Sequence, residues 1–284
     1  MAERWDADSG WAPWRAGLRV ACRQRTLVLL TVFAVACERA LTIGMHLAGS
    51  DPAALGEAAL DQGLRWLEQP SRLVSLLPFG GMEGYLLVAT AAFLLGLFVL
   101  VGVVGLLRDL LLRGHYRAEY VLARGWRYCG PMIAFKLPLY LGVGLGYLLV
   151  LGAVPLRQPD GGWSWNGLAT GGLLCTLIFF GAQIVLSLGA KIIVAEEVRA
   201  PGRVYRRIGA LARPRLGRVL RFYAVRLLVL LMTLAGSALA WRAQLPVGVR
   251  VAGSIALLGW ATLLLKAATF SFYLRLAGRP AAIG

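Results

Sequence analysis

The stretch TLVLLTVFAVACERALTIGMHLA (Thr26–Ala48) decides the fold class, because it is apolar along nearly all of its length. A helix needs about 20 predominantly apolar residues to cross the hydrocarbon core of a bilayer, so this stretch is long enough to span one. Glu38 and Arg39 nevertheless lie side by side near its middle. A charge at that depth costs roughly 2.5 to 3.5 kcal/mol on insertion scales, and we therefore expect a compensating partner elsewhere in the chain.

Five further apolar runs are equally long, and together with the first they predict an all-α polytopic membrane protein with six transmembrane helices. They are Gly84–Leu107, Pro131–Leu156, Gly167–Val194, Leu216–Trp241 and Val247–Leu274. The composition agrees, since 58% of the 284 residues are hydrophobic, whereas apolar residues make up roughly 45 to 50% of an ordinary soluble domain. Five spans remain an alternative if the first run is re-entrant, although its length and flanks favour crossing.

The distribution of basic residues predicts the orientation, because Lys and Arg are retained on the cytoplasmic side of a membrane. With the N-terminus inside, most of the 30 Lys and Arg residues fall on cytoplasmic flanks. The opposite side receives only Arg65, Arg72, Arg157, Arg242 and Arg250. We therefore expect a cytoplasmic N-terminal segment (residues 1–25), a membrane domain (residues 26–274) and a cytoplasmic tail (residues 275–284).

Lysine is scarce among the basic residues, which together with the many Ala, Gly, Leu and Val residues suggests a GC-rich bacterial genome. Residues 1–25 mix charges of both signs before any apolar run begins, so they do not predict a cleaved signal peptide. The first apolar run is then expected to remain as a membrane anchor. These observations favour a multi-pass protein of the bacterial inner membrane.

Basic amphipathic segments precede the first, third and fifth predicted spans. They lie at Trp14–Arg25, at about residues 115–130 and at about residues 201–217. One fixed shift aligns Arg117 with Arg203 and Arg127 with Arg213, and a fixed offset is the signature of a duplicated unit. The pattern predicts three repeats, each an elbow helix followed by a transmembrane hairpin.

The elbows are expected to lie in the inner-leaflet interface, with their arginines toward the phosphates of anionic lipids. The headgroup candidates are Arg15, Arg19, Arg117, Arg127, Arg203 and Arg213. A plain membrane anchor is the alternative role for each elbow. On the outer side, residues 52–69 alternate apolar and acidic residues at near-helical spacing, which predicts a short amphipathic helix.

The segment KIIVAEEVRAPGRVYRRIGAL (Lys191–Leu211), which follows the fourth predicted span, carries a family resemblance. With the six spans and the cytoplasmic ends, it resembles the glycerophosphoryl diester phosphodiesterase membrane domain and the related YciC-like bacterial inner-membrane proteins. The resemblance is one of architecture and covers most of residues 14–275. It implies a membrane domain that is not itself a hydrolase.

Polar residues within the predicted spans are the candidates for a functional site. Glu38 lies near the midplane, so we expect it to face the bundle interior and to meet a cation from another span. The candidate cations are Lys136, Arg226 and Lys266, and Gln183 could add a hydrogen bond. Arg39 points about 100° away from Glu38 around the same helix, so the two residues do not simply pair.

Two interpretations of these charges stay open. They could form a buried ion pair that fixes helix register, or they could line a polar cavity for an anionic lipid headgroup or a proton-coupled substrate. Lysines and arginines in the inner half of a span can also extend their charged ends to the membrane surface. That third possibility applies to Lys136, Lys191, Arg226 and Lys266.

The sequence gives little reason to expect catalysis, a cofactor or a metal. The two histidines, His46 and His115, are predicted on opposite faces, and the four cysteines have no metal-ligand spacing. The basic charge has no polar domain to present it to nucleic acid. We therefore expect a non-enzymatic accessory or scaffold subunit that binds anionic lipid and other membrane-protein subunits. A small transporter or permease component is the alternative, and a membrane-embedded lipid enzyme is a third.

Overall fold

The computed structural model describes residues 10–39, 82–154, 164–242 and 246–279, and these residues form helices without any strand. The helices are α1 (Ala12–Arg23), α2 (Arg25–Glu38), α5 (Met82–Arg113), α6 (Val121–Ala153), α7 (Trp165–Glu196), α8 (Pro201–Ala212), α9 (Leu216–Arg242) and α10 (Val247–Leu276). Two short 3-10 helices, η2 (Ala118–Tyr120) and η3 (Arg213–Arg215), precede α6 and α9. Within the described residues, five helices are long and apolar enough to cross a membrane, and six if the bent α1–α2 pair is one span. The protein is thus an all-helical, polytopic membrane protein.

Each predicted span coincides with a helix wherever the structure describes it. The remainder of the first span, after Arg39, and the predicted outer helix at residues 52–69 lie outside the described residues. The segment at residues 115–130 differs from the expectation of a separate elbow, because only η2 stands apart and α6 then runs unbroken through Pro131 and Pro138. A proline within a helix removes one hydrogen bond and kinks the helix, and a long apolar helix tolerates that loss.

Helix α1 is a short, basic helix that meets α2 at an angle of 89° at Gln24. Its apolar face, which includes Trp14, Val20 and Ala21, is buried against α10. The contact is close at Gly17, where an added Cβ would lie 2.9 Å from the backbone nitrogen of Ala268. Such an approach requires glycine, because any larger side chain would push the two helices apart.

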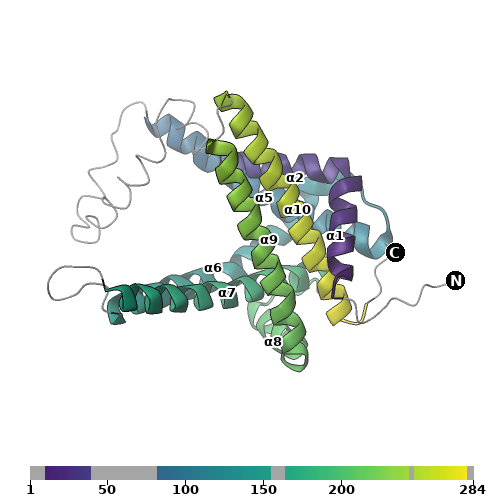
Figure 1. Cartoon of the computed structure of the whole chain (residues 1–284). Coiled ribbons are helices and arrows are strands. Elements are labelled where there is room, and N and C mark those ends of the chain that lie inside the picture. The colour runs from purple at the N-terminus through teal and green to yellow at the C-terminus, as the bar shows by residue number, and fades with distance from the viewer. Residues whose placement is uncertain (1–9, 40–81, 155–163, 243–245, 280–284) are drawn as a thin grey trace.

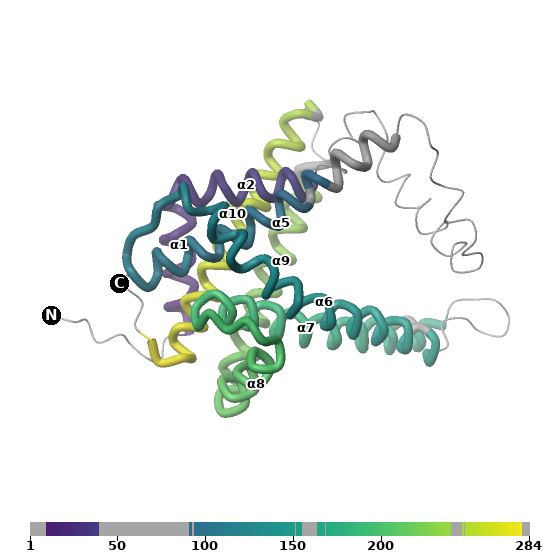
Figure 2. The backbone as a smooth tube through the Cα atoms, turned by 180° about the vertical axis from the view of Figure 1, so that it is seen from behind, coloured from purple at the N-terminus to yellow at the C-terminus, as the bar shows by residue number. Residues whose placement is uncertain are grey.

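The helices diverge from a common base, as Figures 1 and 2 show. The α6–α7 pair projects away from the rest, the α9–α10 pair points in another direction, and α2 runs beside α5. At the base, the buried core includes Leu106, Leu107, Phe135, Tyr223 and Phe270. The core therefore holds the inner ends of the helices together, while their outer parts separate.

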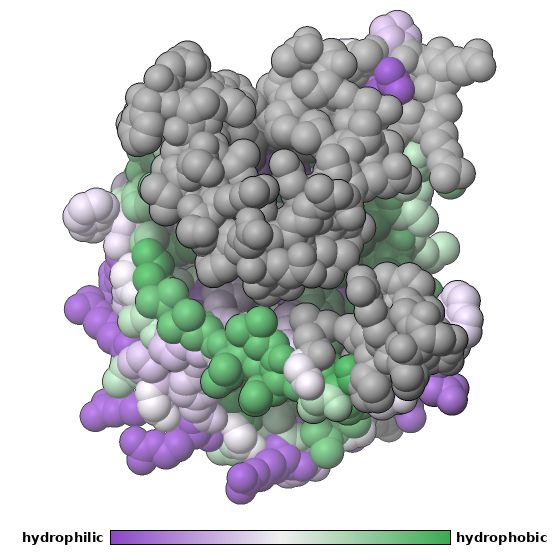
Figure 3. Space-filling view, turned by 90° about the vertical axis from the view of Figure 1, so that its left-hand side faces the viewer, coloured by the Kyte–Doolittle hydropathy of each residue, from purple (hydrophilic) through white to green (hydrophobic). Residues whose placement is uncertain are grey.

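The outer parts of the helices carry apolar side chains on their surface. Along α6, Leu141, Leu145 and Leu149 are each more than half exposed. Seen from the side on which the α6–α7 pair ends, apolar residues lie between strongly hydrophilic ones, which gather mainly at the lower and left edges of the described surface (Figure 3). A surface that would be unfavourable in water suits the acyl chains of a bilayer.

Candidate functional site

The three lysines of the chain converge on one cavity between the helices. Lys136 on α6, Lys191 on α7 and Lys266 on α10 line it together with Arg226 on α9. The cavity has a volume of about 160 Å³. Each residue comes from a different helix, so the cluster exists only because the inner ends of these helices pack together.

The cluster is withdrawn from the surface. Lys191 is only 3% exposed, so its side chain does not extend to the membrane surface, which corrects that expectation for this residue. Its ammonium group lies 5.8 Å from the centroid of the Phe270 ring, and the Arg226 guanidinium lies 5.4 Å from that of Tyr223. Aromatic faces attract cations, yet by roughly 0.5 to 2 kcal/mol, which is less than the penalty for burying a charge.

Arg226 carries a hydrogen-bond donor that lacks a partner among the described residues. This donor is its Nε atom, which is buried. A buried donor without a partner costs about 1 to 3 kcal/mol, and more when the group is charged. An acceptor within the cavity would remove this cost.

Neutral polar groups complete the lining of the cavity. Gln183 and Ser187 of α7 and Tyr140 of α6 face it. The Thr269 hydroxyl also lies there but donates to the Leu265 carbonyl oxygen at 2.6 Å. Tyr140 is 55% exposed, so the cavity reaches the open side of α6, where the α6–α7 pair leaves the core.

Glu38 lies at the last residue of α2, beside the cavity and not in its lining. It interacts electrostatically with Lys266, Lys136 and its neighbour Arg39. It also packs on α5, because a Cβ added at Gly96 would lie 3.1 Å from the Glu38 Cγ atom. Of the predicted residues, the structure places Lys136, Gln183, Arg226 and Lys266 in the cavity, Glu38 next to it, and Arg39 on the exposed surface. Sequence reasoning left Lys191 out of this set, although its position in an apolar run was a signal.

A second set of charges, at the base of the bundle, is paired. The Glu197 carboxylate accepts hydrogen bonds from Arg108 at 2.8 Å and from Arg127 at 2.6 Å. Asp109 accepts one from Arg124 at 2.7 Å, and this pair is largely buried. We call these five residues the base network. It joins α5 and α6 to the end of α7.

Glu196 extends the pairing to two more helices. It accepts hydrogen bonds from the Tyr273 hydroxyl of α10 at 2.7 Å and from the Arg207 Nε atom of α8 at 3.1 Å. Sequence reasoning missed these acids as partners. The acidic pair at the end of the fourth predicted span, surrounded by basic elbows, was the available signal.

Glu197 has an unusual backbone conformation for its residue type. It caps α7 with φ 55° and ψ 30°, a left-handed geometry that favours glycine. Partial desolvation raises the pKa of its carboxyl, but the hydrogen bonds and charges of Arg108 and Arg127 outweigh it and hold the pKa below the ordinary value of 4.5. The carboxylate is therefore the reason for a glutamate at a position suited to glycine.

The predicted headgroup arginines are all exposed, and their surroundings differ. Arg127 belongs to the base network, and Arg117 lies 3.8 Å from Glu119 in an exposed pair. The remaining candidates are exposed, on α1, α8 and η3: Arg15, Arg19, Arg203 and Arg213. Because Glu197 already binds its guanidinium group, Arg127 is less available to a lipid phosphate than its exposure alone would suggest.

Comparison with known proteins adds no family assignment. No protein-family model matches the chain, and neither the curated proteins nor the solved structures contain a match. The resemblance to YciC-like proteins stays a prediction. The case for a function therefore depends on the chemistry of the described residues.

Proposed function

We propose that this protein is a non-enzymatic membrane subunit that binds an anionic group in the lysine cavity. The observation that supports this proposal most is that Lys136, Lys191, Arg226 and Lys266 share a cavity of about 160 Å³, while Glu38 beside it is the one carboxylate of the described residues that interacts with any of them. Buried cations are stable when they are paired and hydrogen-bonded, and one carboxylate is not enough for four of them. A bound anion supplies the missing charge.

The size of the cavity limits the ligand. About 10 to 15 Å³, measured in the same way, is enough for one water molecule, so about 160 Å³ holds a tetrahedral oxyanion with some water. It does not hold a whole phospholipid. The fitting ligands are a phosphate, sulfate or carboxylate group, either free or as the head of a lipid whose chains remain outside.

Access from the lipid side favours the head of an amphiphile. Tyr140 is exposed at the side of α6 while it also lines the cavity. The neighbouring outer surface of α6 carries exposed leucines. A headgroup could enter there while its acyl chains stay against apolar side chains.

We also propose six spans with both termini in the cytoplasm, as three repeats of an elbow helix and a hairpin, in a bacterial inner membrane. The bend between α1 and α2 and the basic character of α8 support this arrangement. Cysteines introduced at Ser164 and Arg203 should react with impermeant reagents from opposite sides. Labelling of both from the same side would contradict the six-span topology.

The position of Glu38 favours transport as a second candidate function. A carboxylate beside the cavity that interacts with Lys266 and Lys136 could release those cations to an incoming anion and take them back afterwards. Anion flux into proteoliposomes, lost in a Glu38→Gln variant that still binds the anion, would distinguish transport from simple binding.

Anion-dependent stability in phosphatidylcholine nanodiscs tests the binding proposal. The probes are inorganic phosphate and a small fraction of phosphatidylglycerol. In their absence, Lys191→Met should raise the stability of the protein, because it removes one buried cation from a repelling cluster. With a probe present, the wild type should gain more stability than this variant.

Arg39→Gln is the matched control, since Arg39 is an exposed cation close to Glu38 but outside the cavity. It should respond to both probes like the wild type. An equal response of Lys191→Met and the wild type, or no response to either probe, would refute binding in the lysine cavity.

A further inference from the structure

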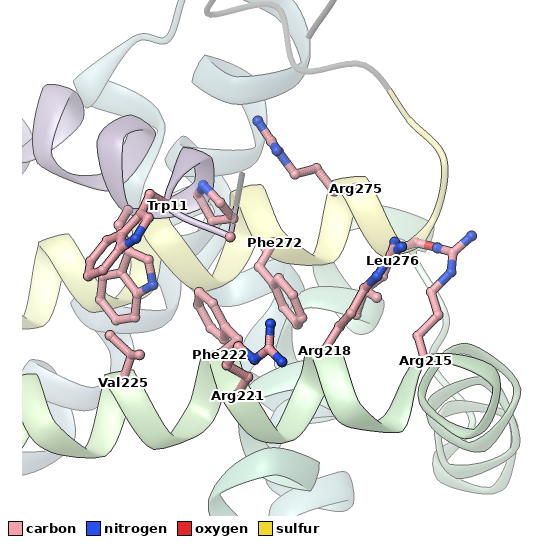
Figure 4. A pocket seen from close by; sticks show the side chains of 12 residues that line it. Trp11, Arg215, Arg218, Arg221, Phe222, Val225, Phe272, Arg275 and Leu276 are labelled. Carbon is pink, nitrogen blue, oxygen red and sulfur yellow. The ribbon is translucent and has the colours of Figure 1, made fainter. Parts of the chain in front are cut away.

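A second hollow lies between α1, α9 and α10 (Figure 4), and its lining shares no residue with the lysine cavity. Its volume is about 350 Å³. Four arginines line it: Arg215, Arg218, Arg221 and Arg275. Four aromatic residues face it as well: Trp11, Trp14, Phe222 and Phe272. We call it the arginine pocket, and none of its arginines belongs to the headgroup candidates predicted from the sequence.

Among the described residues, no acidic side chain lines the arginine pocket. Arg215, Arg218 and Arg221 recur every third residue, which places them on neighbouring positions of one helical side. In Figure 4 the side chains of Arg218 and Arg221 extend from α9 toward α10. Arg215 donates to the Leu276 carbonyl oxygen at 2.6 Å, which fixes it at the end of α10.

A continuous aromatic stack forms the apolar wall of the pocket. The Trp14 and Phe222 ring centroids are 5.1 Å apart, and those of Phe222 and Phe272 are 4.1 Å apart with the rings nearly parallel at 2°. Trp11 stands at the rim and is 63% exposed. The stack ties α1, α9 and α10 together and gives the pocket a firm apolar surface.

We infer that the arginine pocket binds a phosphate group, carried by a phospholipid or free in solution. Guanidinium groups bind phosphate through two parallel hydrogen bonds each, and several arginines can share its oxygens. The aromatic wall then takes the apolar part of the ligand. Of the two sources the lipid uses both surfaces, because a free phosphate leaves the aromatic wall exposed.

The position of the pocket fits the depth of a lipid headgroup. Arg218 and Arg221 lie near the start of α9 and Phe272 near the end of α10, so the pocket lies at one end of two membrane-spanning helices. Tryptophans such as Trp11 and Trp14 are common at that depth. The inference rests on these observations alone and not on the lysine cavity.

The test measures phosphatidylglycerol retained by the delipidated protein in native mass spectrometry, and stabilisation of the protein by inorganic phosphate. The test variant carries Arg218→Gln with Arg221→Gln. It should bind phosphatidylglycerol about tenfold more weakly than the wild type, since charge-assisted hydrogen bonds are lost. The matched control carries Arg113→Gln with Arg206→Gln, two exposed arginines outside the pocket and outside the predicted headgroup set, and should bind like the wild type.

A variant with Arg218→Lys and Arg221→Lys separates recognition from folding and from net charge. It should fold like the wild type and bind with intermediate strength, because lysine keeps the charge but lacks the planar fork. The free ion would be identified as the source if inorganic phosphate stabilised the wild type as much as the lipid does. This stabilisation should then be lost in the variant with Arg218→Gln and Arg221→Gln. Equal losses in the test and control variants would overturn the inference.

The same measurements distinguish this pocket from the lysine cavity. Lys191→Met leaves the arginine pocket intact, so it should retain phosphatidylglycerol there. If the glutamine variant binds the lipid normally while Lys191→Met does not, the arginine pocket is not a phosphate site and the lysine cavity is.

Discussion

The base network and the lysine cavity differ in how their positive charges are balanced by carboxylates. In the base network, Glu197 is shared by Arg108 and Arg127, and Asp109 is bonded to Arg124. In the lysine cavity, Glu38 is the one carboxylate of the described residues that interacts with the four cations, and it does so only with Lys136 and Lys266. Paired charges hold elements together, whereas an excess of one sign is costly to bury unless a ligand offsets it. The contrast supports our proposal that the lysine cavity binds an anion, while the base network stabilises the fold.

The largest expected effect comes from breaking the buried pair of the base network. Asp109→Ala or Arg124→Ala should each lower the free energy of unfolding by about 3 to 5 kcal/mol, because each leaves an uncompensated charge. The side chains are only 9% and 17% exposed, so solvent screens them little. Unfolding in detergent measures the loss.

The double variant, with both Asp109 and Arg124 changed to Ala, tests whether loss of their ion pair causes the destabilisation of the single variants. It should lose less than the sum of the single losses, because it leaves no orphan charge. If the two single losses add within about 0.5 kcal/mol, the residues are not coupled and the base network is not a structural unit.

A smaller effect is expected from adding volume at the base. Gly102 of α5 lies so close to α6 that an added Cβ would be 2.2 Å from the backbone oxygen of Val121. Gly102→Ala should therefore destabilise the protein by about 1 to 3 kcal/mol, as overpacking does. Gly130→Ala is the control, since nothing lies within 4 Å of an added Cβ there. Similar stabilities of the two variants would contradict a closely packed base.

Substitution of Glu38, which lies beside the lysine cavity, should have an effect of about 1 to 2 kcal/mol. Glu38→Gln removes a carboxylate that offsets Lys266 and Lys136, so it should lower stability. Lys266→Met in the same chain should restore part of the loss. A double-mutant cycle measures the coupling, which should exceed about 1 kcal/mol for Lys266. Coupling to Arg226 instead would place Glu38 differently from the arrangement described above.

The smallest expected effect is the loss of stability at low pH when the Glu197 carboxylate is protonated. Because the folded-state pKa lies below the ordinary value of 4.5, its ion pairs stabilise the protein fully above that pH. The stabilisation is lost as the pH falls from about 4.5 through the lower folded-state pKa. The side chain is 39% exposed, so the contribution should stay below about 1 kcal/mol.

Unfolding measured from about pH 6 to about pH 3, a range that includes the ordinary pKa of Glu, checks this effect. Glu197→Gln should be less stable than the wild type at the upper end and should approach it at the lower end. Glu197→Gly separates backbone from charge, since glycine adopts the positive φ without strain but lacks the carboxylate. A constant difference between Glu197→Gln and the wild type at every pH would show that the carboxylate charge does not matter.

The sequence by itself determined the helical membrane class and the approximate position of the long apolar helices. Apolar runs of sufficient length do this locally, because a backbone in hydrocarbon must satisfy its own hydrogen bonds and the helix does so within one segment. Glu38 could also be identified as a charge in need of compensation, because a charge near the middle of a span is costly. The sequence pattern predicts that the third span begins at Pro131, but α6 begins at Val121 and continues through this proline.

Only the tertiary structure decided which charges meet. Lys136, Lys191, Arg226 and Lys266 lie on four different helices, and their spacing along the chain does not indicate whether they face lipid, water or one another. The same holds for the arginine pocket, where the end of α10 and the start of α9 meet α1. Hydropathy records how favourable each segment is in a membrane, but the rotation of each helix about its axis depends on side-chain packing between helices. That packing turned four isolated intramembrane cations into one cavity.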